Sequence, residues 1–234
     1  MPYQVLTNQE PVETVLDLVG DEVEFHVWDP NDQALAAILP EIEGIYLYGL
    51  LHVTREMMDK MPALKVVCTT SVGYDHIDVQ TARERGIAVG HTPRVLSGAV
   101  ADMAFALMLS LTRNVIPANE YAHGPKFKSF LTEVFMGHEV HDSTLGIVGL
   151  GNIGKEIAKR AHGFDMNILY YDIRQDSAIE KAYGAKFCGL NELFEQSDFV
   201  VLMVPLNKST YHMVGEEQLR LMKPTAELIN ISRG

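Results

Sequence analysis

Cysteine is scarce in this sequence. Two of the 234 residues are cysteines, Cys68 and Cys188, and they lie far apart inside apolar, strand-like runs. This placement favours two buried, reduced thiols in a cytoplasmic protein over a disulfide.

Positive charge is also in deficit. The chain has 19 lysines and arginines against 31 aspartates and glutamates, which gives a net charge of −12 with no basic cluster. This balance argues against a nucleic-acid partner and against binding to anionic membrane surfaces. The remaining composition, 47% hydrophobic and 21% charged, is typical of a soluble globular protein.

Long hydrophobic runs are missing as well. The most apolar stretch, residues 99–111, is too short to span a bilayer and contains Asp102. The first ten residues, "MPYQVLTNQE", have no basic segment that leads into an apolar run, so we expect no signal peptide. We therefore expect a cytoplasmic protein without a membrane partner.

Short β-branched runs alternate with helical patterns along most of the chain. This alternation predicts βαβ units around mostly parallel sheets, and the expected fold class is α/β. The candidate strands form two series: 3–6, 23–27, 44–48, 64–69 and 86–90, then 144–149, 166–172, 185–189, 198–205 and 226–232. The segment "GHTPRV" interrupts the rhythm between the two series. We therefore expect one domain over residues 1–94 and a second over residues 95–234.

A strongly apolar helix is expected over residues 97–113. Ser97 is its candidate N-cap. Apolar side chains occur on every side of the predicted helix, which indicates burial all round, either inside a domain or at a subunit contact.

The segment "TLGIVGLGNIGKEIAKRA" contains the spacing G-x-G-x-x-G as Gly149, Gly151 and Gly154. An apolar strand precedes it and an amphipathic helix follows it. In this context the first glycine allows a tight turn, the second lets the backbone approach a pyrophosphate, and the third lets the helix pack closely on the sheet. The helix N-terminus offers unpaired N–H groups to the same pyrophosphate. Asn152 and Ile153, between the second and third glycines, join the candidate cofactor-binding residues, and a glycine-rich turn without a ligand is the alternative.

The next candidate strand ends in an acidic residue. Asp172 lies 18 residues after Gly154 and is placed to accept hydrogen bonds from the ribose of an adenosine. A carboxylate there repels a 2′-phosphate, so NAD is the expected cofactor. Arg174 keeps NADP as the alternative, because an arginine can pair with that phosphate.

The segment "HEVH" at residues 138–141 resembles a metal-binding motif. It departs from the H-E-x-x-H pattern because position 142 is Asp. We expect these two histidines to be solvated or structural, with no metal bound.

Together these motifs resemble the D-2-hydroxyacid dehydrogenase family, and most closely its glyoxylate/hydroxypyruvate reductase branch. The resemblance covers nearly all of the chain and rests on five stretches in the family's order: "LKVVCTTSVGYDHID", "RGIAVGHTPRVL", "STLGIVGLGNIG", "SDFVVLMVPLNKST" and "LMKPTAELINISRG". It implies a flavodoxin-like substrate domain, a Rossmann-type dinucleotide domain and an active site in the cleft between them. It also implies a homodimer in which the apolar helix is buried against a second copy.

The resemblance assigns roles in the first domain. Val72 and Gly73 would hold the substrate carboxylate through their backbone N–H groups, and Gly73 has no side chain to block the approach. The segment around Tyr48 to Leu50 would line the substrate pocket, with Leu50 as its substrate-binding member. The alternative for Ser71 to Gly73 is an ordinary turn at a strand end.

Further roles fall in the second domain. Arg233, in "NISRG", matches the family's catalytic arginine and would fork onto the carboxylate and carbonyl of a 2-oxo acid. Pro205 and Thr210 resemble positions that flank the adenosine, and Ile231 joins the candidate cofactor-binding residues. The alternative for Arg233 is a frayed arginine without a role.

The resemblance implies an oxidoreductase that transfers a hydride between NAD(P)H and a small 2-oxo acid such as glyoxylate or hydroxypyruvate. A glutamate and a histidine that the family places further along the chain fall outside these 234 residues. We therefore expect these residues alone to bind a dinucleotide at best and to turn over negligibly, unless His76 or His91 acts as the acid. The alternative function is an NAD-binding regulatory or scaffolding module of the co-repressor type.

Overall fold

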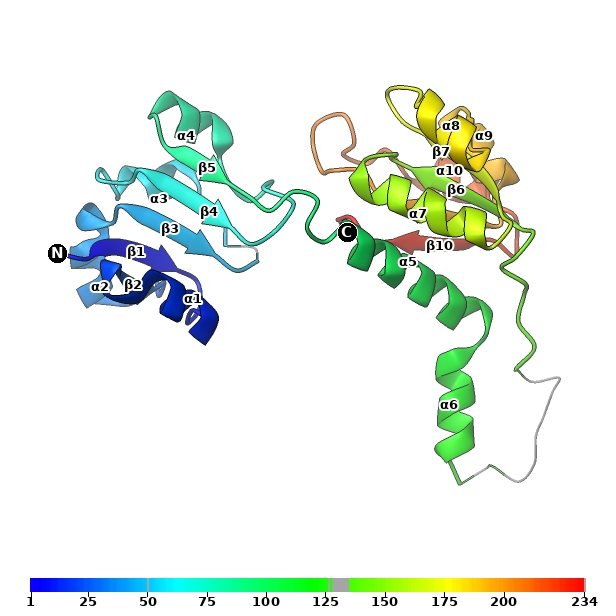
Figure 1. Cartoon of the computed structure of the whole chain (residues 1–234), viewed down its shortest axis with the longest axis horizontal. Coiled ribbons are helices and arrows are strands. Elements are labelled where there is room, and N and C mark those ends of the chain that lie inside the picture. Colours follow the sequence, from blue (N-terminus) through cyan, green and yellow to red (C-terminus); the bar gives the residue numbers. More distant parts are fainter. Residues whose placement is uncertain (50, 126, 128–134, 234) are drawn as a thin grey trace. The chain divides into compact units, whose positions relative to one another are not determined.

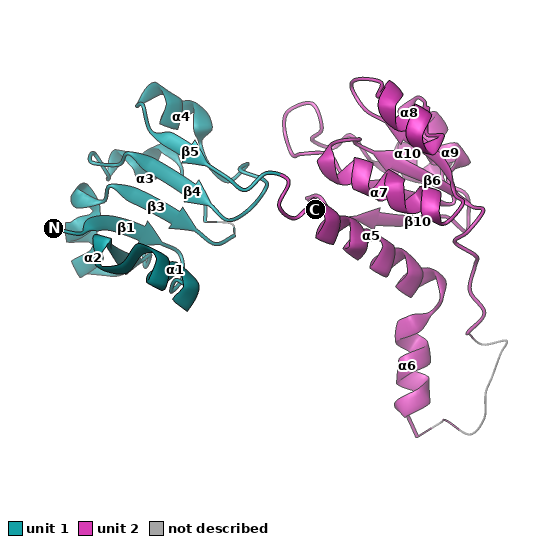
Figure 2. Cartoon of the chain, viewed as in Figure 1, with its two compact units in different colours: residues 1–93 teal, residues 94–234 magenta. Residues whose placement is uncertain are grey.

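The computed structural model describes residues 1–49, 51–125, 127 and 135–233 of the chain. It divides into two compact units, Met1–Pro93 and Arg94–Gly234 (Figure 2). The division falls one residue before the expected start of the second domain.

The first unit is built on a five-stranded parallel sheet in the order β2-β1-β3-β4-β5 (Figure 1). Its strands are β1 (Tyr3–Thr7), β2 (Val23–Val27), β3 (Gly44–Leu47), β4 (Val66–Thr69) and β5 (Ala88–Gly90). Its helices are α1 (Glu13–Val19), α2 (Gln33–Ile38), α3 (Arg55–Asp59) and α4 (Val79–Glu84), with 3₁₀ turns η1 (Gly20–Glu22) and η2 (Leu39–Glu41). The strand order 2-1-3-4-5 is the flavodoxin-like order.

The second unit contains another five-stranded parallel sheet, in the order β10-β9-β6-β7-β8. Its strands are β6 (Thr144–Val148), β7 (Asn167–Tyr171), β8 (Lys186–Phe187), β9 (Phe199–Leu202) and β10 (Glu227–Asn230). Its helices are α5 (Ser97–Thr112), α6 (Val115–His123), α7 (Asn152–Gly163), α8 (Ser177–Tyr183), α9 (Leu190–Gln196) and α10 (Glu216–Leu221). Read from β8, the order is 3-2-1-4-5, as in Rossmann-type sheets.

Both faces of the second sheet are covered, because successive side chains of a strand point to opposite faces. Ile147 of β6 packs in one buried cluster with Phe105 of α5 and Ile157 of α7. Its neighbour Val148 packs in another with Phe194 of α9. This doubly wound arrangement, with the strand orders above, confirms the predicted α/β class.

All ten expected strands are present, most of them shorter than the apolar runs suggested. The predicted cap of α5 is wrong. Ser97 is the first helical residue, and the N-cap position belongs to Leu96, whose side chain makes no capping hydrogen bond.

Helix α5 is not buried all round within its own unit. Phe105 and Met108 are buried, whereas Met103 and Leu111 are each 54% exposed. Among the described residues no single helix is long and apolar enough to cross a bilayer, and α5 and α6 satisfy those criteria only as a pair bent by 61°.

Both cysteines are free thiols. Cys188 is buried as expected, and burial raises the pKa of its thiol to about 11, which keeps it protonated at neutral pH. Cys68 is half-buried, so the expectation of full burial holds for one of the two.

Candidate functional site

The glycine turn after β6 has the backbone that its sequence spacing predicts. Gly149 has a φ of +100°, in the region that side chains disfavour. A Cβ atom on Gly149 would lie 2.8 Å from the carbonyl oxygen of Met203, which follows β9. The carboxyl ends of β6 and β9 are therefore so close that only glycine fits between them.

The other two glycines open helix α7. Gly151 is its N-cap, and a Cβ there would meet no protein atom within 4 Å. A Cβ on Gly154 would lie 2.2 Å from the carbonyl oxygen of Gly149, so the helix packs directly on the turn. Asn152 and Ile153 form the first turn of α7, where backbone N–H groups have no partner within the helix and favour an anion.

Asp172 directly follows β7, one residue beyond the strand that it was predicted to end, and has a role that the sequence did not reveal. Its Oδ2 accepts a hydrogen bond from Leu150 N at 2.6 Å, inside the glycine turn, and its Oδ1 accepts one from Ile173 N at 2.7 Å. The carboxylate therefore fixes the turn from the neighbouring strand end. Arg174 is exposed nearby in the chain.

The order of the strands explains why the glycine turn is a binding position. The chain leaves β6 towards β7 and β8 on one side, and returns to β9 and β10 on the other. Ligands of open α/β sheets bind outside the carboxyl ends of the strands at this change of direction. The residues that follow β6, β7, β9 and β10 all lie at that end.

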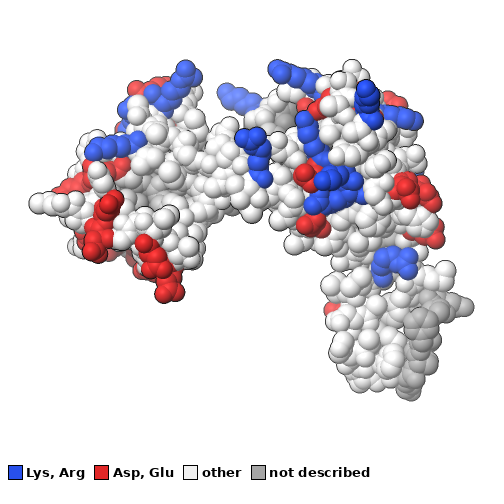
Figure 3. Space-filling view, viewed as in Figure 1, with Lys and Arg blue, Asp and Glu red and all other residues white. Residues whose placement is uncertain are grey.

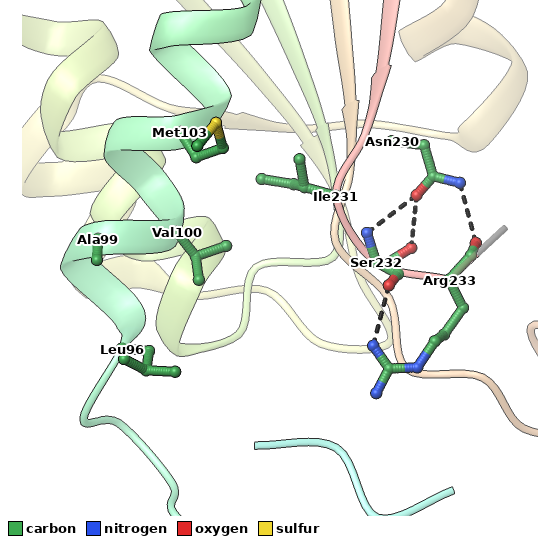
Figure 4. Close-up of a pocket in the computed structure, with 8 residues that line it drawn as sticks. All are labelled: Leu96, Ala99, Val100, Met103, Asn230, Ile231, Ser232 and Arg233. Carbon is green, nitrogen blue, oxygen red and sulfur yellow. Dashed lines mark hydrogen bonds between the residues drawn. The ribbon is translucent and has the colours of Figure 1, made fainter. Parts of the chain in front are cut away.

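A cavity of about 640 Å³ lies between the start of α5 and the end of β10 (Figure 4). The residues that line it are Leu96, Ala99, Val100, Met103, Asn230, Ile231, Ser232 and Arg233. Ile231, a predicted cofactor residue, and Arg233, the predicted catalytic residue, thus share one cavity with an apolar wall from α5.

Asn230 shapes the end of β10. Its Oδ1 accepts hydrogen bonds from Ser232 N at 3.0 Å and Ser232 Oγ at 2.9 Å, and its Nδ2 donates to the carbonyl oxygen of Arg233 at 2.9 Å. The Arg233 guanidinium donates to the carbonyl oxygen of Ser232 at 3.0 Å (Figure 4). This local turn holds Arg233 beside the strand end, although neither Asn230 nor Ser232 was a predicted site residue.

A second cavity, of about 320 Å³, shares Asn230, Ser232 and Arg233 with the first. Its other wall is the segment after β9, which includes Thr210 and Tyr211. The Thr210 hydroxyl donates to the carbonyl oxygen of Pro205 at 2.5 Å and closes this loop. Pro205 and Thr210, predicted to flank an adenosine, are therefore joined to each other in one loop.

The predicted carboxylate loop follows β4 in the first unit. Neither Val72 N nor Gly73 N donates a hydrogen bond to another described residue. Two adjacent N–H groups with this freedom form a concavity that suits an anion.

The segment predicted to line the substrate pocket follows β3. Leu50 itself lies outside the described residues. Tyr48 is held by Asn8, which follows β1: Asn8 Oδ1 accepts from Tyr48 N at 2.7 Å and Asn8 Nδ2 donates to the Tyr48 carbonyl oxygen at 2.5 Å. β1 and β3 are the strands between which the first sheet changes direction, so this pair occupies its ligand-binding end.

The histidines of interest lie in different surroundings. His76 is 2% exposed, which leaves its ring little access to a substrate. His91 is exposed, and its Nδ1 lies 2.9 Å from the carbonyl oxygen of Val72. In the "HEVH" segment, His141 pairs with Glu139 and Asp142, and no group of three metal-ligating side chains occurs among the residues that the structure describes.

The surface charge is mixed. On the face drawn in Figure 3, lysines and arginines are interspersed with aspartates and glutamates, and most of the surface carries neither. This face offers no broad basic area of the kind that binds nucleic acids.

Comparison with known families decides the classification. Residues 105–234 match the NAD binding domain of the D-isomer specific 2-hydroxyacid dehydrogenases, and residues 5–166 match the catalytic domain of the same family. The chain belongs to the D-isomer specific 2-hydroxyacid dehydrogenase family. The predicted resemblance is therefore confirmed, and the glycine turn lies in the NAD binding domain of this dehydrogenase.

Individual relatives are similar over most of the chain. The glyoxylate reductase of Pyrococcus horikoshii is 40% identical over 242 aligned residues, which cover 100% of this chain and 72% of the relative. The glyoxylate/hydroxypyruvate reductase B of Yersinia pestis is 40% identical over 205 residues, covering 87% of this chain and 63% of the relative. The D-lactate dehydrogenase of Aquifex aeolicus, solved with NAD and lactic acid, superposes with a TM-score of 0.87 at 30% identity over 99% of this chain and 69% of that protein.

Several residues of this dehydrogenase were missed from the sequence. Asn230 and Ser232 have a local signal, since Asn and Ser at the end of a strand often form turns through their side chains. The bond from Leu150 to Asp172 has no such signal, because the two residues meet only when β6 and β7 pair.

Proposed function

We propose that the protein containing these 234 residues reduces glyoxylate or hydroxypyruvate at the expense of a nicotinamide dinucleotide. One observation carries the proposal: the three glycines of the NAD binding domain form a turn at the change of strand direction, with the arginine of "NISRG" at the same end of the same sheet. The names of the two reductases that are 40% identical support the choice of acid. No relative described above supports a scaffolding role.

The residues present fit a dinucleotide. Gly151 leaves an open approach to the N-terminus of α7, where the pyrophosphate would be held by backbone N–H groups. Asp172 would accept hydrogen bonds from the adenosine ribose, and the loop that joins Pro205 to Thr210 would lie against the adenosine. When bound, the nicotinamide supplies the hydride, while the protein supplies orientation and electrostatics.

The acid would be held through its charge. Arg233 would bind the carboxylate and the carbonyl oxygen of the 2-oxo acid with a fork of N–H donors, and so favour the negative charge that develops on that oxygen. The N–H groups of Val72 and Gly73 would hold the carboxylate. A panel of 2-oxo acids tests the choice: loss of nicotinamide absorbance should be fastest with the two- and three-carbon acids, and a preference for a bulky branched acid would overturn it.

We predict that the chain binds NADH more tightly than NADPH, because the Asp172 carboxylate repels a 2′-phosphate. Asp172→Asn should narrow the gap between the two affinities. The asparagine keeps one oxygen that can accept from Leu150 N, so it disturbs the turn less than alanine would. Calorimetric titration of both cofactors measures the gap, and equal affinity in the unsubstituted chain would point to Arg174 instead.

We predict a homodimer through α5 and α6. Leu107 and Leu111 lie four residues apart on α5 and are exposed, as is Ile116 of α6, so they form an apolar stripe that needs a partner. A second copy provides it in a two-fold arrangement. Light scattering at micromolar concentration should give a dimer, and Leu111→Glu should shift it to a monomer.

A matched control tests whether the effect is specific to this stripe or would follow from replacing any exposed leucine. Leu219 on α10 is 48% exposed, close to the 54% of Leu111. Leu219→Glu should leave the dimer intact. A monodisperse monomer before any substitution would contradict the prediction.

A further inference from the structure

In the loop after β4, the backbone carbonyl oxygens accept hydrogen bonds, whereas Val72 N and Gly73 N donate none to the described residues. Four consecutive carbonyl oxygens, those of Thr70, Ser71, Val72 and Gly73, all accept a hydrogen bond. The donors are Thr92 Oγ1 to Thr70 at 2.8 Å, Thr92 N to Ser71 at 3.2 Å, His91 Nδ1 to Val72 at 2.9 Å and Ser71 Oγ to Gly73 at 2.5 Å. Three of the four come from two residues that directly follow the neighbouring strand β5.

These bonds fix the direction of the two N–H groups proposed to hold the carboxylate. In a trans peptide the C=O and the N–H of one plane point in opposite directions. The Ser71 carbonyl shares its plane with Val72 N–H, and the Val72 carbonyl shares its plane with Gly73 N–H. Thr92 and His91 therefore turn both N–H groups away from the end of β5.

The peptide plane between Val72 and Gly73 is the one that can rotate most easily. Glycine adopts positive and negative φ with similar ease, so rotation of this plane meets little resistance from Gly73. A rotated plane would present the Val72 carbonyl oxygen to an anion in place of Gly73 N–H. His91 is the donor that opposes this rotation.

The His91 ring is itself held on two sides. Its Nδ1 meets the Val72 carbonyl, and its ring packs edge-on against Tyr74 with 5.0 Å between centroids. A carbonyl oxygen only accepts, so Nδ1 carries the proton in this contact.

We propose that His91 is a positioning residue that orients Gly73 N–H for the substrate carboxylate. The proposal rests on the function proposed above, because it assigns a device to the same carboxylate loop. His91 acts through the peptide plane and does not touch the substrate.

Oxalate, a small dicarboxylate that is not reduced, is the probe. Titrated calorimetrically into the NADH-loaded protein, it should bind about tenfold more weakly to His91→Leu, the loss expected for one hydrogen bond to a charged group. His91→Asn retains an N–H donor and should stay within about twofold of the unsubstituted protein. NADH affinity should be the same in all three.

His123 provides a matched control. It is exposed, and its Nδ1 also lies near a backbone carbonyl, that of Asn119 at 3.0 Å, within α6. His123→Leu should leave oxalate binding unchanged. This result would show that the effect comes from the His91 hydrogen bond in particular and not from the loss of any exposed histidine hydrogen bond.

The outcomes separate the two proposals. Oxalate binding that is equal in the unsubstituted protein and His91→Leu would overturn the role of His91 and leave the proposed function standing. Absence of oxalate binding in the unsubstituted protein would overturn the carboxylate loop and, with it, the role of His91. Imidazole NMR of the unsubstituted protein is independent of any folding defect: His91 should carry its proton on Nδ1, and a proton on Nε2 would overturn the proposal.

Discussion

Gly151→Ala should weaken NADH binding by roughly five- to 150-fold, the effect of forcing one extra methyl group into a close-packed contact. The folded chain should lose almost no stability. A Cβ at this position meets no protein atom within 4 Å, and its backbone is extended, with φ −71° and ψ −162°. The methyl group therefore has nothing to collide with except a pyrophosphate at the start of α7.

Gly189→Ala is the control for this change. Gly189 is also a helix N-cap with an extended backbone, and a Cβ there also meets nothing within 4 Å. It precedes α9, which follows the edge strand β8 and is not at the change of strand direction. NADH affinity should be unchanged in this variant. Equal affinity in Gly151→Ala would mean that the dinucleotide does not approach the glycine turn.

Gly154→Ala, in contrast to Gly151→Ala, should cause a large loss of stability. Its Cβ would lie 2.2 Å from the Gly149 carbonyl oxygen, which belongs to the backbone and cannot rotate away. Relieving the clash requires α7 to move off the sheet, at a cost of about 2–4 kcal/mol in the free energy of unfolding. Thermal unfolding followed by circular dichroism should show a midpoint lower by roughly 5–15 °C.

The last residue of the same helix provides the comparison. A Cβ on Gly163 would meet nothing within 4 Å. Gly163→Ala should be neutral or slightly stabilising, because it restricts the unfolded chain without a clash. A midpoint that is the same in Gly154→Ala and Gly163→Ala would show that α7 does not pack on the glycine turn as described.

The elements of the fold were predictable because each has a local signature. Val, Ile and Leu in short runs mark β6 and β9, and their positions in the middle of a sheet covered on both faces leave little choice of structure. The glycine turn was equally predictable, because Gly149 and Gly154 occupy positions where a side chain would clash with backbone.

The features that were predicted wrongly or missed depend on the backbone path and on contacts between elements. The N-cap of α5 is set by the backbone path into the helix, which places Leu96 and not Ser97 at the boundary. The exposed face of α5 depends on which side meets α7 and the sheet, and an all-apolar helix gives no preference. The second role of Asp172 depends on the pairing of β6 with β7, which brings Leu150 N to its carboxylate.

The candidate site likewise contains residues that were predictable from the sequence and contacts that were not. Arg233 and the Val72–Gly73 loop could be proposed from motifs that match the family. The hydrogen bond from His91 to Val72 could not, because these two residues are distant in the sequence and meet only in the fold. Asn230 bonds to Arg233 three residues away, so its local signal was present in the sequence but was missed.

Reduction of hydroxypyruvate, with the configuration of the product determined, is the decisive measurement. The protein expressed from its complete gene should consume NADH only when a 2-oxo acid is present. It should form one D-glycerate for each NADH oxidised, as expected for a D-isomer specific dehydrogenase. Saturable NADH binding without oxidation by glyoxylate or hydroxypyruvate, or formation of the L-isomer, would contradict the proposed function.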